Sequence, residues 1–220
     1  MFDQATVEML MEGVVDTLYM TIVSTFFSYV FGIVMAVVLV ICRKDGIRPN
    51  PVVYSVLDVV VNLTRSFPFL ILMILVVPLT RLIVGKSYGS VASIVPLVVA
   101  AFPFVARLVE SSLREVNPNI IEMAQSMGAS PLQIICKVML PESVPSLINN
   151  AAIAITTILG YSAMGGAIGA GGLGKLAIMY GYNRYQTDIM IATVILLIII
   201  VQIFQSFGNW ATRRSDKRGS

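Results

Sequence analysis

The sequence predicts an all-α protein, a polytopic membrane helix bundle with about five transmembrane helices in a single domain spanning residues 1–220. Hydrophobic residues make up 57% of the 220-residue chain and charged residues only 12%, against about 45–50% and about 25% in soluble domains. Apolar runs of about 20 residues, enough to cross a ~30 Å hydrocarbon core as helix, recur along the chain. These runs lie at residues 17–42, 52–79, 88–109, 146–164 and 187–210.

The first run is expected to remain in the mature protein. It is too long for a signal peptide, no basic region precedes it, and Cys42-Arg43-Lys44 follows it in place of a small-residue cleavage site. Residues 1–16 carry acidic residues and apolar residues at helical spacing. This pattern predicts an amphipathic lead-in that lies at the membrane interface.

The distribution of Lys and Arg predicts the orientation, because cytosolic loops retain positive charge. Ten basic residues fall on one predicted side: Arg43, Lys44, Arg48, Arg107, Arg114, Lys137, Arg213, Arg214, Lys217 and Arg218. Four fall on the other: Arg81, Lys86, Lys175 and Arg184. The N-terminus is therefore predicted outside and the C-terminus in the cytosol. This topology also accounts for the net charge of +3, so nucleic-acid binding has little support.

Two features of composition argue against an enzyme. The chain has no histidine, which excludes His-based catalytic triads and makes a zinc site improbable. Its two cysteines, Cys42 and Cys136, fall on the predicted cytosolic side, where thiols stay reduced. We expect no disulfide, no metal and no cofactor.

Five spans in a chain of this length form a small bundle, which does not comfortably enclose a solute path by itself. A homodimer, or a heterodimer with a similar chain, is expected. Prolines within the second and third runs and polar residues in the fourth, including Asn150 and Ser162, should face other helices or a solute path.

The stretch GYSAMGGAIGAGGLGKL, residues 160–176, contains a formal G-x-G-x-x-G and a near P-loop. A nucleotide-binding loop must follow a strand and open a helix, whereas this stretch follows a membrane helix and is predicted to face outside. We interpret it as close helix packing or as an unwound helix end beside a cavity. Met164 within it is either a plug that closes a pore or a packing residue.

Arg65 lies inside the second run, where a guanidinium at the bilayer centre costs about 2.5–3.5 kcal/mol on insertion scales. It should therefore face protein or water. Asp58, seven residues earlier on the same helical face, is a candidate counter-ion. In the alternative, Arg65 lies shallower and its side chain reaches back to the cytosolic interface.

The polar stretch EMAQSMGASPLQIICKVMLPES, residues 122–143, interrupts the apolar pattern. Before it, Asn117 is suited to cap a helix with Pro118 at its first position, and Gly128 suits the end of that helix. The helix is roughly 15 Å long at ~1.5 Å per residue, about half of a membrane thickness.

A second short helix is predicted directly afterwards. Ser130 caps it, Pro131 takes its first position and Gln133 completes a capping box; the helix should stop before Pro141. We expect one face of this helix to carry Leu132, Ile135, Cys136 and Met139. A rigid, partly apolar pair of short helices of this kind fits a groove on a soluble partner. The alternative, a helical hairpin lying on lipid, would favour a more basic polar face than this one.

The spacing E-M-A, three residues, Gly128, nine residues and V-M-L-P resembles the EAA loop of ABC importer permeases, E-A-A-x3-G-x9-I-x-L-P. Met123 and Val138 depart mildly from that pattern. The stretches NLTRSFPF, PLTRLIVG, FPFVARLVE, EMAQSMGASP and GYSAMGGAIGAGGLG resemble those of methionine importer permeases, and the likeness covers nearly the whole chain.

The resemblance implies a multi-pass subunit of a bacterial inner membrane, surrounded by lipid, whose EAA loop docks into a cytosolic ATPase and couples ATP-driven closure to alternating access. Two copies of the chain would pair with two ATPase subunits and receive methionine, D-methionine included, from an extracytoplasmic binding protein. The residues expected to couple to the ATPase are Glu122, Ala124, Gly128, Ala129, Ser130, Pro131, Leu140 and Pro141.

We expect the translocation path or its gate to include Arg65, Tyr161, Ser162 and Met164. The alternatives are a permease for another amino acid or small solute, a secondary transporter or channel that works without ATP, and a membrane scaffold with no solute path. A secondary transporter would be expected to show intramembrane acids as ion sites and an internal repeat. Asp58 is the one candidate acid that the sequence suggests, and no repeat is visible.

Overall fold

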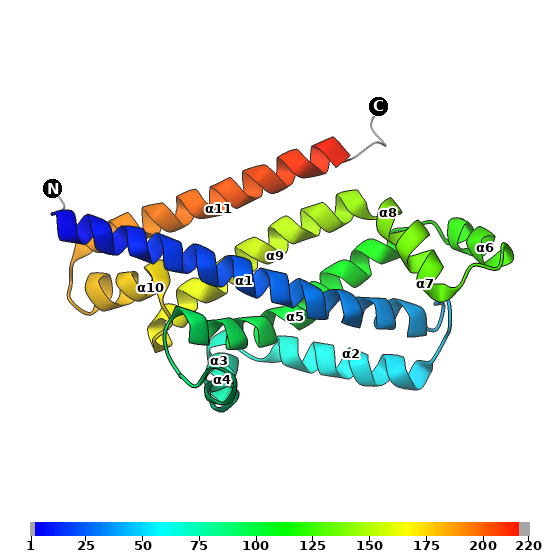
Figure 1. The fold of residues 1–220 in the computed structure, drawn as a ribbon, viewed down its shortest axis with the longest axis horizontal. Coiled ribbons are helices and arrows are strands. Elements are labelled where there is room, and N and C mark those ends of the chain that lie inside the picture. The colour runs from blue at the N-terminus through cyan, green and yellow to red at the C-terminus, as the bar shows by residue number, and fades with distance from the viewer. Residues whose placement is uncertain (1–2, 216–220) are drawn as a thin grey trace.

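The computed structural model describes residues 3–215 of the chain, in which every regular element is a helix. Long helices run side by side along the long axis of the molecule, with short helices at both ends (Figure 1). The elements are α1 Gln4–Cys42, α2 Pro51–Ser66, α3 Phe69–Leu75, α4 Val77–Val84, α5 Ser90–Arg114, α6 Pro118–Ser126, α7 Pro131–Ile134, the π-helix η1 Ile135–Met139, α8 Leu140–Glu142, α9 Val144–Gly165, the 3₁₀ turn η2 Gly166–Ile168, α10 Gly172–Leu176, the π-helix η3 Ala177–Tyr182 and α11 Thr187–Ser215.

The prediction of an all-α membrane bundle with about five spans is confirmed. Four helical stretches in residues 3–215 are long and apolar enough to cross a membrane, and a bent helix pair raises that number to five. The four are α1, α5, α11 and the stretch Val144–Tyr182.

The second predicted span, residues 52–79, is not one continuous helix. It breaks after Ser66, and α3 is turned by 106° from α2. Pro68 explains the break, because it has no N–H for the α2 ladder and drives the preceding residue out of helical geometry. Phe67 accordingly adopts extended dihedrals, φ −69° and ψ 133°.

The expectation of a separate lead-in along the interface is wrong, since residues 4–16 are the first turns of α1. The carboxylate of Asp3 caps this helix by accepting the N–H of Thr6 at 2.9 Å. Gly13 lies against the side chains of Leu173 and Leu176 on α10, so these turns pack on protein.

The most extensive helix pair joins α1 to α5. A buried stripe of mostly small residues, from Thr21 through Ser28 to Gly32 and Ala36, runs along α1. A Cβ at Gly32 would lie 2.7 Å from a methyl carbon of Val105 on α5. The lack of a side chain at Gly32 therefore allows the two helices to approach closely.

The basic residues are distributed unevenly between the two ends of the bundle. The C-terminal ends of α1 and α11 and the helices α6 to α8 lie at one end, while the starts of α1 and α11 lie at the other (Figure 1). Most of the ten basic residues predicted on one side belong to the end with α6 to α8; Lys217 and Arg218 lie outside the described residues. Arg107 is an exception, because it lies inside α5.

Candidate functional site: a capped helical knuckle and a cavity at a helix break

The first short helix of the polar stretch, α6, has the predicted caps. The Asn117 side chain accepts the N–H of Asn119 at 3.0 Å. After the helix, Gly128 adopts a positive φ of 78°. The N–H of Gly128 donates to the Gln125 carbonyl at 2.9 Å and that of Ala129 to the Ala124 carbonyl at 3.1 Å. These two bonds form a Schellman motif, which holds the bend after α6.

The second short helix begins as predicted but does not end where expected. Ser130 and Gln133 form both bonds of the capping box, at 2.8 and 3.4 Å. The chain then passes through the π-helix η1 and continues past Pro141 into α8. The Leu140 N–H donates to the Ile135 carbonyl, five residues back. We attribute the continuation to this wider turn, which accommodates a proline without ending the helix.

The predicted common face of Leu132, Ile135, Cys136 and Met139 is also wrong. Ile135 and Met139 are buried in a core cluster with residues of α1 and α5. Leu132 and Cys136 are exposed instead.

Segment 117–141 presents a different apolar surface. Met123 and Met127, one turn apart on and just after α6, are exposed, Met127 to 81%, and so is Leu132. Sequence reasoning took Met123 as a departure from the EAA pattern and did not consider Met127. These three exposed apolar side chains at one end of the bundle form a candidate docking surface.

The eight residues predicted to couple lie in this segment at different depths. Ala124 is buried, Ala129, Pro131 and Leu140 are half-buried, and Glu122, Gly128, Ser130 and Pro141 are exposed. Glu122 lines a recess of about 360 Å³ together with Arg43 and Arg114. The recess lies between the C-terminal end of α1 and helix α6.

Polar contacts tie together the two long helices that flank the segment. The Asn150 amide on α9 donates to the Leu108 carbonyl at 3.1 Å and to the Ser112 hydroxyl at 2.8 Å, both on α5. The Ser146 hydroxyl reaches Ser112 at 3.0 Å and the Glu115 carboxylate at 2.9 Å. Asn150 thus faces another helix, as predicted, and these contacts join α9 to α5.

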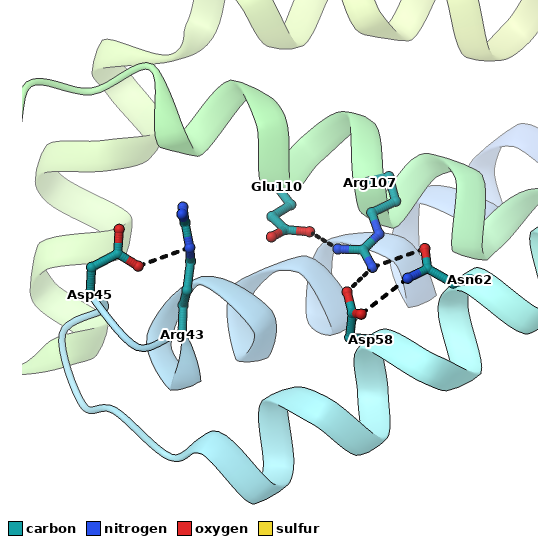
Figure 2. Close-up of polar contacts among 6 residues, drawn as sticks. All are labelled: Arg43, Asp45, Asp58, Asn62, Arg107 and Glu110. Atoms are coloured by element: carbon teal, nitrogen blue, oxygen red, sulfur yellow. Dashed lines mark hydrogen bonds and ion pairs between the residues drawn. The ribbon is translucent and has the colours of Figure 1, made fainter.

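An ion-pair network joins α5 to α2. The Arg107 guanidinium pairs with Asp58 and with Glu110, the latter at 2.6 Å, and also reaches the Asn62 side chain at 3.2 Å (Figure 2). The prediction that Asp58 neutralises Arg65 is therefore wrong. The sequence analysis did not identify Glu110, whose side chain is 3% exposed. Its three-residue spacing from Arg107 places both residues on one helical face, and this spacing was the available signal of the pair.

Arg65 and Tyr161 line one cavity of about 250 Å³ at the break between α2 and α3. The Tyr161 ring stacks on Phe69, with centroids 4.4 Å apart. Met164, one turn beyond Tyr161, is 53% exposed. Ser162 is buried and donates to the Leu159 carbonyl at 2.8 Å. Neither Ser162 nor Met164 lines the cavity that Arg65 and Tyr161 share.

The glycine-rich stretch packs closely against its neighbours, as interpreted. A Cβ at Gly166 would lie 2.3 Å from the Gly174 backbone, and one at Gly174 would lie 2.1 Å from the Ala163 carbonyl oxygen. The Leu173 N–H donates to the Thr17 hydroxyl at 2.8 Å. Because the backbone of this stretch is buried against α1 and α9, its N–H groups are not arranged as an open phosphate-binding loop.

Comparisons with known proteins agree with this geometry. Residues 28–218 match the model of the family described as binding-protein-dependent transport system inner membrane component. The chain is 47% identical over 211 residues to the probable D-methionine transport system permease protein MetI of Vibrio cholerae serotype O1, covering 96% of this chain and 94% of that protein. It is 48% identical over 158 residues to the D-methionine transport system permease protein MetI of Escherichia coli K12, covering 72% and 73%.

Solved structures extend the likeness to three dimensions. A chain of the MetNI methionine ABC transporter, from a crystal form with inward-facing conformations, superposes with a TM-score of 0.96 at 44% identity, covering 98% of this chain and 100% of that one. An amino acid ABC transporter with histidines shares the fold at a TM-score of 0.77 and 17% identity, covering 97% and 99%. The chain therefore belongs to the family of binding-protein-dependent transport system inner membrane components.

Proposed function

We propose that this chain is the membrane subunit of an ATP-driven importer of methionine, and that it accepts D-methionine as well. It performs no chemistry of its own, because ATP is hydrolysed on a separate cytosolic subunit. The likeness to two D-methionine permeases and to the MetNI transporter supports this substrate and this division of labour.

The observation that carries the proposal is the construction of segment 117–141. A Schellman bend at Gly128 and a capping box at Ser130 fix two short helices, and these helices present Met123, Met127 and Leu132 to the surface. An apolar helix face held rigid in this way fits a groove on a partner protein.

The assembly follows from the size and polarity of the bundle. Two copies of the chain enclose the path at a two-fold axis, each copy binds one ATPase subunit, and an extracytoplasmic methionine-binding protein delivers the substrate. Basic residues gather at the end that carries α6 to α8, which supports a cytosolic C-terminus and an N-terminus outside.

Coupling proceeds through the helices beside the segment. Closure of the two ATPases moves both 117–141 segments, and the Asn150 and Ser146 contacts oblige α5 and α9 to move with them. Alternating access is then a rigid-body motion of helices around the path. Arg65, Tyr161, Ser162 and Met164 remain the proposed residues of the path or its gate.

Ion-driven transport would use acidic side chains within the helices as ion sites, but Asp58 and Glu110 are already engaged. Asp58 and Glu110 each pair with Arg107. This pairing favours ATP as the energy source over an ion gradient.

The test is transport by purified components. The chain is reconstituted in vesicles with its ATPase and binding protein, and uptake of labelled L-methionine, D-methionine and other amino acids is measured. The proposal expects uptake that requires ATP and prefers methionine. Uptake that persists without ATP and collapses with the ion gradient would overturn it, and so would preference for another solute.

A further inference from the structure

Arg65 is a charged side chain at membrane depth that has no counter-ion among residues 3–215. It shares its cavity with Ala100 and Phe104, which lie about halfway along α5. The residue is exposed, and Asp58 is already paired with Arg107. Because an unpaired guanidinium at this depth is unfavourable in hydrocarbon, Arg65 must face water or an anion.

The helix break beside Arg65 adds a partial negative charge near this positive side chain. The last carbonyls of α2 have no partner from the next turn, because Pro68 has no N–H and α3 turns away. The Thr64 carbonyl receives only the Phe67 N–H, at a long 3.4 Å. The carbonyl end of a helix attracts a cation. The Arg65 guanidinium and the carbonyl end of α2, within one turn of each other, therefore match the carboxylate and the ammonium of an amino acid.

The remaining walls of the cavity are apolar and aromatic. Phe69 and Tyr161 stack with an angle of 6° between their rings. Phe67, Leu72, Ala100 and Phe104 also line the cavity. The volume of about 250 Å³ lies just below the ~300–1,000 Å³ of pockets for drug-sized ligands. An unbranched apolar side chain fits such a space, and a thioether sulfur makes favourable contacts with aromatic rings.

We propose that this cavity is a transient intramembrane station for the transported amino acid, in which Arg65 binds the carboxylate as a bidentate pair and the aromatic walls hold the side chain. The proposal rests on the proposed function and adds to it a substrate class: a zwitterion with an apolar side chain. The planar fork of arginine makes two parallel hydrogen bonds to a carboxylate, which lysine cannot reproduce.

The test is equilibrium binding to the complex of permease and ATPase in lipid nanodiscs, without the binding protein. Labelled L-methionine is compared with methioninol, which keeps the thioether and the amine but lacks the carboxylate. The wild-type complex should bind methionine and should bind methioninol far more weakly. Arg65→Gln should weaken methionine binding by about 10- to 100-fold, the range expected for losing a charge-assisted pair, and Arg65→Lys should lie between the two.

Arg81→Gln is the matched control, because Arg81 is an exposed arginine on α4 that does not line the cavity. It should bind methionine like the wild type. Co-purification of each variant with the ATPase shows that it is folded. The proposal fails if the wild-type complex binds no methionine, if methioninol binds equally well, or if Arg65→Gln binds like the wild type. Failure of the proposed function is distinct, since the wild-type system would then show no ATP-dependent methionine uptake.

Discussion

Arg107 on α5 pairs with Asp58 on α2, a residue 49 positions away in the chain (Figure 2). The same guanidinium binds Glu110, and Asn62 connects to both Arg107 and Asp58. The hydroxyls of Thr64 and Ser66, by contrast, donate to carbonyls within α2 itself. The pair therefore holds the helix that carries Arg65 against the helix that leads into segment 117–141.

Removing this arginine should destabilise the protein strongly. Arg107→Met leaves the almost fully buried Glu110 without its partner, and breaking a buried pair in this way typically costs about 3–5 kcal/mol. The triple change Arg107→Met, Asp58→Asn and Glu110→Gln should recover much of that loss, because no unpaired charge remains. Thermal unfolding of the detergent-solubilised protein measures both effects.

Arg43→Met provides the control for that experiment. Arg43 pairs with Asp45 at 2.8 Å, but the Asp45 side chain is 67% exposed, and exposed pairs contribute only about 0–1 kcal/mol. If Arg43→Met and Arg107→Met shifted the unfolding temperature equally, the network between α2 and α5 would carry no special stability.

Local signals predicted the helix caps of segment 117–141 correctly. The capping residues Asn117, Gly128 and Ser130 form hydrogen bonds to residues within a few positions. Their roles can therefore be predicted from the neighbouring sequence alone. The all-helical fold and the number of spans follow from composition and run length, which also depend on nothing distant in the chain.

The errors concern residues whose environment is set by other helices. By sequence spacing Asp58 shares a helix face with Arg65, but the packing of α2 on α5 brings Arg107 to it instead. Ile135 and Met139 fit an outward face by spacing, but the core formed with α1 and α5 buries them. At Pro141, the π-helical turn before it decided whether the helix ended, and periodicity does not reveal a single wide turn.

The exposed methionine on the bend should contribute to ATPase binding. Met127→Ala is expected to weaken association with the ATPase by about 5- to 30-fold, the effect of truncating an apolar anchor worth about 1–2 kcal/mol. Val52→Ala is the control, because Val52 is an exposed apolar residue at the same end of the bundle, in the first turn of α2. Pull-down titration of the two subunits measures both variants; equal affinities would remove Met127 from the docking surface.

Close packing of the glycine-rich stretch predicts opposite effects at two glycines. Gly174→Ala places a methyl carbon against the Ala163 carbonyl oxygen and should cost about 1–3 kcal/mol through overpacking. Gly160→Ala meets no atom within 4 Å and should stabilise helix α9 by about 0.5–1 kcal/mol. Thermal unfolding compares the two, and a neutral Gly174→Ala would contradict the packing interpretation.

The two cysteines report the orientation of the chain. Cys136 is exposed on η1 and Cys42 is half-buried at the end of α1, so a membrane-impermeant maleimide should label Cys136 only from the cytosolic side. In a cysteine-free variant, Tyr185→Cys at the opposite end, where Tyr185 is 88% exposed, should react only from outside. The reverse pattern of labelling would invert the proposed topology.

Gly128 should matter more for coupling to the ATPase than for stability. A second glycine, Gly85, serves as a control that separates the two effects. Gly128 and Gly85 both adopt left-handed backbone, with φ of 78° and 74°, and neither has an atom within 4 Å of an added Cβ. Valine at either position therefore strains the backbone by a similar ~1–2 kcal/mol. Gly85 ends α4, far in the chain from the docking segment, whereas Gly128 holds the Schellman bend. Gly128→Val should thus reduce ATP-dependent uptake severalfold more than Gly85→Val at equal levels of inserted protein, because only the first change alters how α6 and α7 meet the ATPase. Equal uptake by the two variants would mean that the bend at Gly128 does not transmit the partner's motion.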